Sequence, residues 1–239
     1  MKKKTVQLGV LVSLFLLLAG CMYPASEKQE NKIPYADQIN SVQNAVDAFR
    51  EEQGGLLPIK NQEQSVPIYQ KYPIDFKKLT KYLSEPPGNA YESGGVFQYV
   101  LINAETDPEV RVFDLRVADA LQEYQLRLQM YLDNNEYLPF KEQLSTYVFT
   151  LDHEKLGYDD VPVIKSPYSE AELHIIVNAD YEVYIDYTPD LIKALEEKEH
   201  DFAQGDDIRD ILAEDSLIVP AYSLPYTIDE DNNPIFLSK

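Results

Sequence analysis

Cysteine, tryptophan, histidine and basic residues are all scarce in this chain. Among its 239 residues are one cysteine, three histidines and no tryptophan, and 21 lysine and arginine residues stand against 41 acidic ones. A single cysteine excludes disulfide bonds within the chain. The net charge of −20 opposes binding to nucleic acid and to anionic lipid headgroups, because both carry negative charge.

Recognisable catalytic signatures are also missing. His153, His174 and His200 share no metal-ligand spacing, and the pattern predicts that His174 points away from the face of its strand neighbours Leu173 and Ile175. We find no G-x-S-x-G elbow, no P-loop and no dinucleotide fingerprint. The many carboxylates are typical of a solvated surface, and the sequence alone identifies no catalytic pair among them. We therefore expect a protein that is not an enzyme, with no catalytic residue, cofactor or metal.

One acidic string needs separate consideration as a metal site. Asp229, Asp231 and Asn233 place oxygen ligands at alternate positions, as the start of an EF-hand loop does. Position six, however, is Pro234 instead of glycine, and the chain ends before a twelfth-position glutamate. A turn rich in Asp and Asn between two short strands, Tyr226–Ile228 and Pro234–Leu237, is the favoured interpretation.

The longest hydrophobic run lies at the N-terminus and is short. Three lysines, Lys2 to Lys4, precede an apolar stretch from Leu8 to Leu18. A transmembrane helix needs about 20 apolar residues, whereas a signal-peptide core of this length is usual. A small-residue cleavage site, Leu18-Ala19-Gly20-Cys21, follows directly.

This site resembles the lipobox of bacterial lipoproteins. The resemblance covers residues 1–21 and implies that the thiol of Cys21 carries diacylglycerol, that the chain is cut before Cys21, and that the new amino group can be acylated with a fatty acid such as palmitate. An ordinary secretory signal with a chance cysteine, or an uncleaved anchor, is the alternative. Two acyl chains hold a protein stably on a membrane, whereas one holds it only marginally.

Under the lipoprotein interpretation, residues 1–20 are a signal peptide and residues 21–34 are a lipidated tether. The polar, aperiodic stretch from Met22 to Pro34 is expected to span about 20 Å as a flexible chain. Cleavage leaves 18 basic against 41 acidic residues and so makes the net charge more negative, at −23. The 18 tyrosines favour half-buried strand positions, with a tyrosine-rich binding face as the alternative.

Periodicity predicts alternating helices and hairpins after Tyr35. Ile39, Val42 and Val46 recur at helical spacing, and Gly54-Gly55 supplies a stop. We expect the following further elements: a short helix at 75–83, a hairpin of strands 96–103 and 109–115, a helix from Val117 to Leu132, a second hairpin within 172–187, a helix opened by Thr188 at N-cap with Leu191, Leu195 and Phe202 facing inward, and another capped by Asp206 and running to Ala213.

Four landmarks recur in the same order with a period near 75–80 residues. Leu56–Lys60 is repeated at Tyr137–Lys141, Tyr72–Leu79 at Phe149–Leu156, Ile102–Ala104 at Val177–Ala179, and Glu109–Val112 at Glu182–Ile185. The pattern predicts an internal duplication, each unit reading helix, Leu-Pro turn, short helix and β-hairpin. Against it, the apolar faces of the first helices match only after a two-residue shift, and a coincidence of common strand patterns is the alternative.

The sequence therefore predicts an α+β fold of two similar units, each a helix packed on an antiparallel β-hairpin. Residues 35–116 would form the first unit, and residues 117–239 the second, with C-terminal helices and a hairpin. The two strand pairs could share one sheet or form two small domains.

The leading functional hypothesis is a non-enzymatic interaction or assembly module, lipid-anchored at Cys21 on the outer face of the cytoplasmic membrane. Its partners would be proteins with a neutral or basic contact surface. The alternative is a lipoprotein that binds a cationic, peptide or cell-wall ligand, which a cleft of Tyr and Asp/Glu between the units would favour. An envelope hydrolase is the third interpretation, and it would need two close carboxylates, one with a raised pKa.

Overall fold

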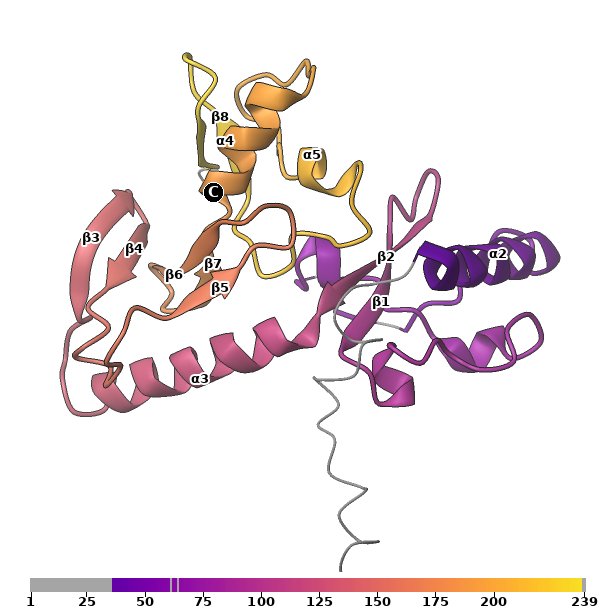
Figure 1. The fold of residues 1–239 in the computed structure, drawn as a ribbon, viewed down its shortest axis with the longest axis horizontal. Coiled ribbons are helices and arrows are strands. Elements are labelled where there is room, and N and C mark those ends of the chain that lie inside the picture. The colour runs from indigo at the N-terminus through magenta and orange to yellow at the C-terminus, as the bar shows by residue number, and fades with distance from the viewer. Residues whose placement is uncertain (1–35, 61, 64, 238–239) are drawn as a thin grey trace, which may run out of the picture.

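The computed structural model describes residues 36–60, 62–63 and 65–237. Within them the chain is a mixture of helices and antiparallel sheets, so the predicted α+β class is confirmed (Figure 1). The α-helices are α2 (Ala36–Glu52), α3 (Leu115–Leu132), α4 (Thr188–Glu197) and α5 (Asp210–Ala213). Three 3-10 helices, η4 (Ile68–Gln70), η5 (Phe76–Leu79) and η6 (Tyr91–Ser93), lie between α2 and the first strand.

The strands form three sheets. Their bounds are β1 (Phe97–Ile102), β2 (Glu109–Asp114), β3 (Phe140–Ser145), β4 (Val148–Leu151), β5 (Val163–Lys165), β6 (Glu172–Asn178), β7 (Val183–Ile185), β8 (Tyr226–Ile228) and β9 (Pro234–Phe236). The pairs β1–β2 and β8–β9 are two-stranded sheets. The order β3-β4-β6-β5, with β7 also paired to β6, makes the largest sheet.

Helix α2 forms because its apolar residues fall on one face. Ile39, Val42 and Val46 are all buried, and they share a core cluster with Val110 and Val112 of β2. Gly54 and Gly55 follow with φ of 64° and 94°, a left-handed conformation that glycine adopts without strain. The predicted stop is therefore confirmed.

Helix α3 begins directly after β2, two residues earlier than predicted. The Asp114 carboxylate accepts a hydrogen bond from the Arg116 backbone N–H at 2.9 Å and caps the helix there. Leu121, Tyr124 and Leu128 are its buried residues and pack in one cluster with strand β6. In Figure 1, α3 runs from the first hairpin along the lower edge of the molecule to the β3–β4 hairpin.

Two sequence expectations about capping are wrong in detail. Helix α4 begins at Thr188, but the Asp186 carboxylate, not the Thr188 hydroxyl, accepts the first helical N–H at 2.9 Å. Asp206 accepts a hydrogen bond from the Ala203 N–H at 2.8 Å and so closes a turn, and the helix that follows begins only at Asp210. The inward positions of Leu191 and Leu195 are confirmed, because both are buried, whereas Phe202 is partly buried.

Strands β3 and β4 were not anticipated. Strand β3 is exposed along nearly its whole length, and its pairing with β4 is shifted in two places. An exposed, irregular edge strand shows no alternation of apolar and polar residues, so the period-2 signal is absent. Phe149–Leu156, which the duplication matches to the segment leading into the short helix of the first unit, completes strand β4 to Leu151 and then forms successive turns.

The segment after α5 pairs with both the β1–β2 hairpin and the β6–β7 hairpin. Residue Ile218 bridges in parallel to Val112 of β2, and Ser223 bridges in parallel to Ile185 of β7. Tyr69, Val100 and Phe113 pack in a separate cluster with Ala213, Val219 and Ala221 of this segment. The segment after α5 therefore ties the two hairpins together.

Two leucines of α3, two residues apart, provide a test of how this helix packs on the sheet. Leu128 is fully buried, whereas Leu126 is 59% exposed. Leu128→Ala should lower the free energy of unfolding by about 2–5 kcal/mol, because it removes buried methylene groups and leaves a cavity. Leu126→Ala is the matched control and should change it by less than about 0.5 kcal/mol. Chemical denaturation of the purified variants measures both, and equal losses would contradict the assigned helix orientation.

Candidate functional site

The predicted lipidation site, Cys21, lies outside the described residues, so its state stays a prediction. The three histidines are described. His174 is exposed between buried Leu173 and Ile175, as predicted. His153 and His174 line the same small pocket of 160 Å³, which the sequence spacing did not indicate. The described part of the chain holds no group of three or more His, Cys, Asp or Glu side chains arranged to bind a metal ion.

The acidic string after β8 forms the predicted turn. The Asp229 carboxylate accepts hydrogen bonds from the backbone N–H groups of Asp231 at 2.9 Å and Asn233 at 2.8 Å. These bonds, with that from the Asn233 backbone strongest, hold the pKa of the Asp229 carboxyl below its usual range. The Asp229 oxygens, the first of the three candidate calcium ligands, are thus engaged in closing the turn between β8 and β9.

A buried carboxylate lies beside a polar pocket in the second half of the chain. Asp190 in the first turn of α4 is only 2% exposed. Ser166 Oγ lies 2.8 Å from each Asp190 oxygen, and Ser169 Oγ donates to Asp190 Oδ1 at 2.5 Å. Ser166 Oγ in turn accepts the backbone N–H groups of Tyr168 at 2.9 Å and Ser169 at 3.0 Å. We call this group of Ser166, Ser169 and Asp190 the clamp, because it fixes the loop between β5 and β6 against the start of α4.

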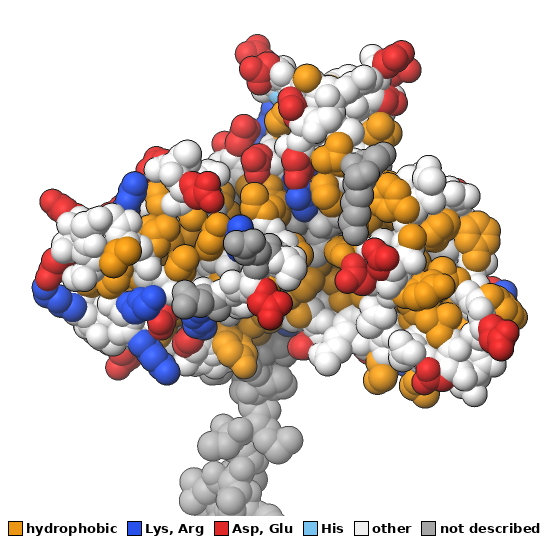
Figure 2. All heavy atoms as spheres, turned by 180° about the vertical axis from the view of Figure 1, so that it is seen from behind, with side chains coloured by type: hydrophobic (Ala, Val, Ile, Leu, Met, Phe, Trp, Pro, Cys, Tyr) orange, Lys and Arg blue, Asp and Glu red, His pale blue; other side chains and the backbone are white. Residues whose placement is uncertain are grey.

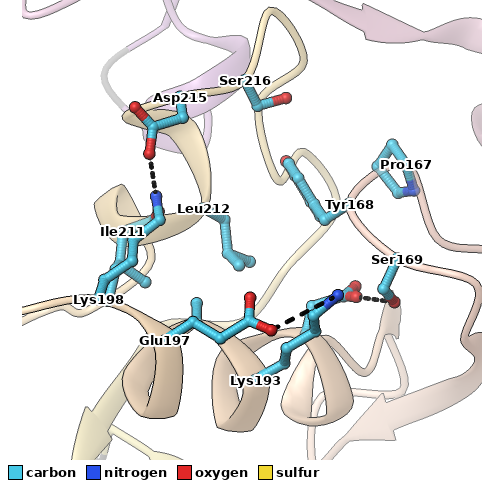
Figure 3. A pocket seen from close by; sticks show the side chains of 12 residues that line it. Pro167, Tyr168, Ser169, Lys193, Glu197, Lys198, Ile211, Leu212, Asp215 and Ser216 are labelled. Atoms are coloured by element: carbon cyan, nitrogen blue, oxygen red, sulfur yellow. Dashed lines mark hydrogen bonds and ion pairs between the residues drawn. The ribbon is translucent and has the colours of Figure 1, made fainter.

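Beside this clamp lies a pocket of 270 Å³ (Figure 3). Its walls come from the 167–169 loop, α4 and α5, and both charge signs lie on its rim. Lys193 Nζ is 4.0 Å from Glu197 Oε1, and Lys198 Nζ is 2.9 Å from Asp215 Oδ2. Tyr168, Ile211 and Leu212 supply apolar surface. Such a lining suits a small zwitterionic molecule better than a single ion.

Ser166 and Ser169 of the clamp are both engaged with Asp190, and of these two only Ser169 lines the pocket. Activation of a serine needs a general base within hydrogen-bond reach. Asp190 lies within that reach, but it accepts hydrogen bonds from both hydroxyls at once, so both of its oxygens are already engaged. Elsewhere in the molecule, a hydrogen bond from Lys81 lowers the pKa of the Glu52 carboxyl. A carboxylic acid that acts as a general acid needs a raised pKa instead. The geometry therefore supports a binding or structural role for the clamp.

The hollow between the two hairpin regions is not the cleft of Tyr and Asp/Glu side chains that would favour a ligand-binding lipoprotein. It has a volume of 590 Å³ and is lined by apolar residues such as Phe97 and Ile164, by the Asp114–Arg116 ion pair, and by Lys165. Most tyrosines with displaced pKa values are shifted upward by burial; burial raises that of Tyr222, for example, to about 12. The sequence favours half-buried strand positions, but among the described tyrosines only Tyr99, Tyr184 and Tyr226 lie in strands, and of these only Tyr184 is half-buried.

Sequence reasoning missed an apolar surface at the C-terminal end of α3. Leu126 and Met130 are 59% and 60% exposed, and Tyr137 and Phe140 beyond the helix are also more than half exposed. A groove of 610 Å³ lies beside them, between α3 and residues 155–157, and we call it the α3 groove. Leu126 and Met130 are four residues apart, so apolar residues on a second face of α3 were the available signal.

Charge is distributed unevenly around these features. Residues 115–237 hold 27 acidic and 8 basic side chains, a net charge of −19. Five lysines instead lie between Lys60 and Lys81. Figure 2 shows lysine and arginine side chains gathered on the side of the molecule formed by α2 and the segment after it. Hydrophobic side chains with acidic neighbours cover the opposite side.

The clamp can be tested through Ser166. Ser166→Ala leaves two backbone N–H groups and one side of Asp190 without their partner. Because unsatisfied buried polar groups are costly, we expect a loss of about 1–3 kcal/mol in the free energy of unfolding. Ser84→Ala, at an exposed serine, is the control. A Ser166→Ala variant as stable as the Ser84→Ala variant would show that the clamp does not hold the loop.

Comparisons with known proteins match only part of the chain. A family model described as the YphF family N-terminal domain matches residues 35–114 and thus ends where β2 ends. No curated protein and no solved structure matches the chain. Over its first described third, the chain is therefore similar to the YphF family N-terminal domain.

Proposed function

We propose that this protein is a non-enzymatic interaction module, anchored by lipid on Cys21 to the outer face of the cytoplasmic membrane. The anchor is supported by the lipobox-like Leu18-Ala19-Gly20-Cys21 and the lysine-led apolar run before it. None of the described helices combines the length and hydropathy that crossing a membrane requires.

The observation that carries the interaction role is the apolar surface at the end of α3. In monomeric proteins, contiguous exposed apolar patches larger than a few hundred Å² commonly mark interaction sites. Leu126, Met130, Tyr137 and Phe140 are each more than half exposed within fifteen residues of sequence. Burying such side chains contributes about 25 cal/mol per Å² of apolar area, so a partner would gain from covering them.

We also propose that the chain contains two similar units, each a helix packed on a hairpin. Equivalent backbone bonds support this: Asp75 N donates to Pro58 O, and Asp152 N donates to Pro139 O, each at 2.7 Å. Further support comes from two similar ladders, in which Tyr72 bonds to Leu101 and Leu101 pairs with Val110, while Phe149 pairs with Val177 and Val177 pairs with Val183. The ladders make Leu101 the counterpart of Val177, a shift of one residue from the repeat in the sequence, which matches Ile102 to Val177. An experimental structure in which these ladders fail to superpose would contradict the duplication.

A binding lipoprotein is the second candidate, favoured by the pocket beside Asp190. Its opposite charges and apolar floor would suit a short peptide or another zwitterion. The pocket is smaller than the usual range of about 300–1,000 Å³ for ligand sites, which places this candidate behind the interaction module.

The anchor predicts a defined loss on substitution of Cys21. Cys21→Ala should abolish incorporation of labelled fatty acid and block normal maturation, because the only thiol is removed. Labelling and membrane fractionation in the native host measure both effects. A variant that matures and labels like the wild type would refute the lipoprotein assignment.

The interaction role can be tested by photo-crosslinking in cells. A photoreactive amino acid at position 126 should form crosslinks to protein in the membrane fraction, because this position lies on the exposed apolar surface. The same amino acid at position 192, an isoleucine that is 43% exposed on α4, is the control. Equal crosslinking at both positions, or none at 126, would contradict an interaction surface on α3 and favour the ligand-binding alternative.

A further inference from the structure

The α3 groove has a fixed wall. Arg127 Nη1 donates to the carbonyl oxygens of Leu156 at 3.3 Å and Gly157 at 2.9 Å. The Arg127 guanidinium also lies over the Tyr158 ring, 4.3 Å from its centroid. These contacts hold the turn after β4 against the helix, so the groove is formed in the free protein and needs no rearrangement to receive a partner.

The apolar surface continues from the groove to strand β3. The rings of Tyr131 and Tyr137 meet edge to face with their centroids 6.1 Å apart. The rings of Phe140 and Phe149 meet in the same way at 6.0 Å. With Leu126 and Met130 on successive turns of α3, this surface has the ridge spacing that a second helix packs against.

Charge decides what can cover this surface. The basic residues that line the groove are already paired: Arg127 lies 2.9 Å from Glu123, and Lys155 lies 3.3 Å from Asp152. Along the chain, five acidic residues line the groove or lie within two residues of its lining (Glu123, Asp133, Glu136, Glu154 and Asp159), against the two basic residues Arg127 and Lys155. This acidic rim has a net charge of −3, within a half of the chain that carries −19.

This negative rim disfavours two occupants. A second copy of the chain would bring its own acidic rim against this one, and like charges across an interface cost free energy. An anionic bilayer would be repelled for the same reason. A segment that is apolar on one face and basic on the other satisfies both the groove and its rim.

We propose that the α3 groove binds a basic amphipathic helix of a partner protein. The apolar face of that helix would cover Leu126 and Met130, and its lysine or arginine side chains would approach the acidic rim, as in other helix-in-groove complexes. This inference rests on the proposed interaction role and names the chemistry of the partner.

The test uses an 18-residue amphipathic peptide of leucine and lysine, immobilised on a biosensor. The full-length lipidated protein in non-ionic detergent is the analyte. We expect saturable binding that weakens at least tenfold in the Leu126→Ser/Met130→Ser variant, because the apolar surface is removed at constant charge. Ile192→Ser/Ile235→Ser removes two similarly exposed residues elsewhere and should bind like the wild type.

Further comparisons separate the apolar and the charge contributions. A scrambled peptide of the same composition should bind at least tenfold more weakly, because it has no apolar face. Glu136→Lys should weaken binding, whereas Glu199→Lys, at an exposed site on the segment after α4, should weaken it less. Affinity should also fall as salt rises. Thermal unfolding of each variant establishes that it is folded.

Three results would overturn the proposal. These are equal binding of the leucine–lysine peptide to the groove and control variants, preference for a leucine–glutamate peptide, and equal binding of the scrambled peptide. If crosslinks still form at position 126 in cells, the interaction role stands and only the basic helical partner is wrong. If no crosslinks form there either, the proposed function itself fails.

Discussion

The pairing of the C-terminal segment with both hairpins is the constraint on which the arrangement depends. Val112 donates its N–H to Leu217 O at 3.0 Å and accepts from Val219 N at 2.9 Å, and Ile185 donates to Tyr222 O at 2.8 Å. One short stretch of chain thereby completes the outer edges of β2 and β7. Tyr69 adds a side-chain bond of 2.5 Å to Asp210, across 141 residues of sequence. Without these contacts, α3 alone would join the two hairpin regions, and the buried cluster around Val100 and Val219 would lose one side.

This constraint leaves the outer face of α3 free. The buried face of the helix, with Leu121, Tyr124 and Leu128, packs on the sheet, and the C-terminal segment closes the molecule from elsewhere. Leu126 and Met130 consequently have no covering element among the described residues. Arg127 sits between them in sequence but reaches sideways to the turn at Leu156 and Gly157. The same helix thus supplies both a core face and an apolar surface that is open to a partner.

Local signals in the sequence predicted the elements that are determined by residues close together in the chain. Helix α2, the β1–β2 hairpin and the turn at Asp229–Asn233 follow from apolar spacing, glycine conformation and Asx chemistry within a few residues. Strand β3 could not be predicted, because it is exposed, shows no apolar alternation, and is held in place by its irregular pairing with β4. The Asp190 clamp was equally hidden, since Ser166 and Ser169 come from a loop more than twenty residues away. The α3 groove depends on a turn that only tertiary contacts place beside the helix.

The proposed anchor and the proposed groove would reinforce each other physically. With Cys21 lipidated as proposed, a tether of about a dozen residues would keep the domain within roughly 20 Å of the membrane surface. For a partner held in the same membrane, binding then resembles an intramolecular step, with an effective concentration that reaches the millimolar range for short linkers. A groove with only modest intrinsic affinity would be well occupied under that condition. The acidic rim would add speed and selectivity, because electrostatic complementarity acts mainly on association rate and on the rejection of like-charged surfaces. A small apolar surface such as that around Leu126 and Met130 would therefore suffice for the proposed membrane-confined interaction.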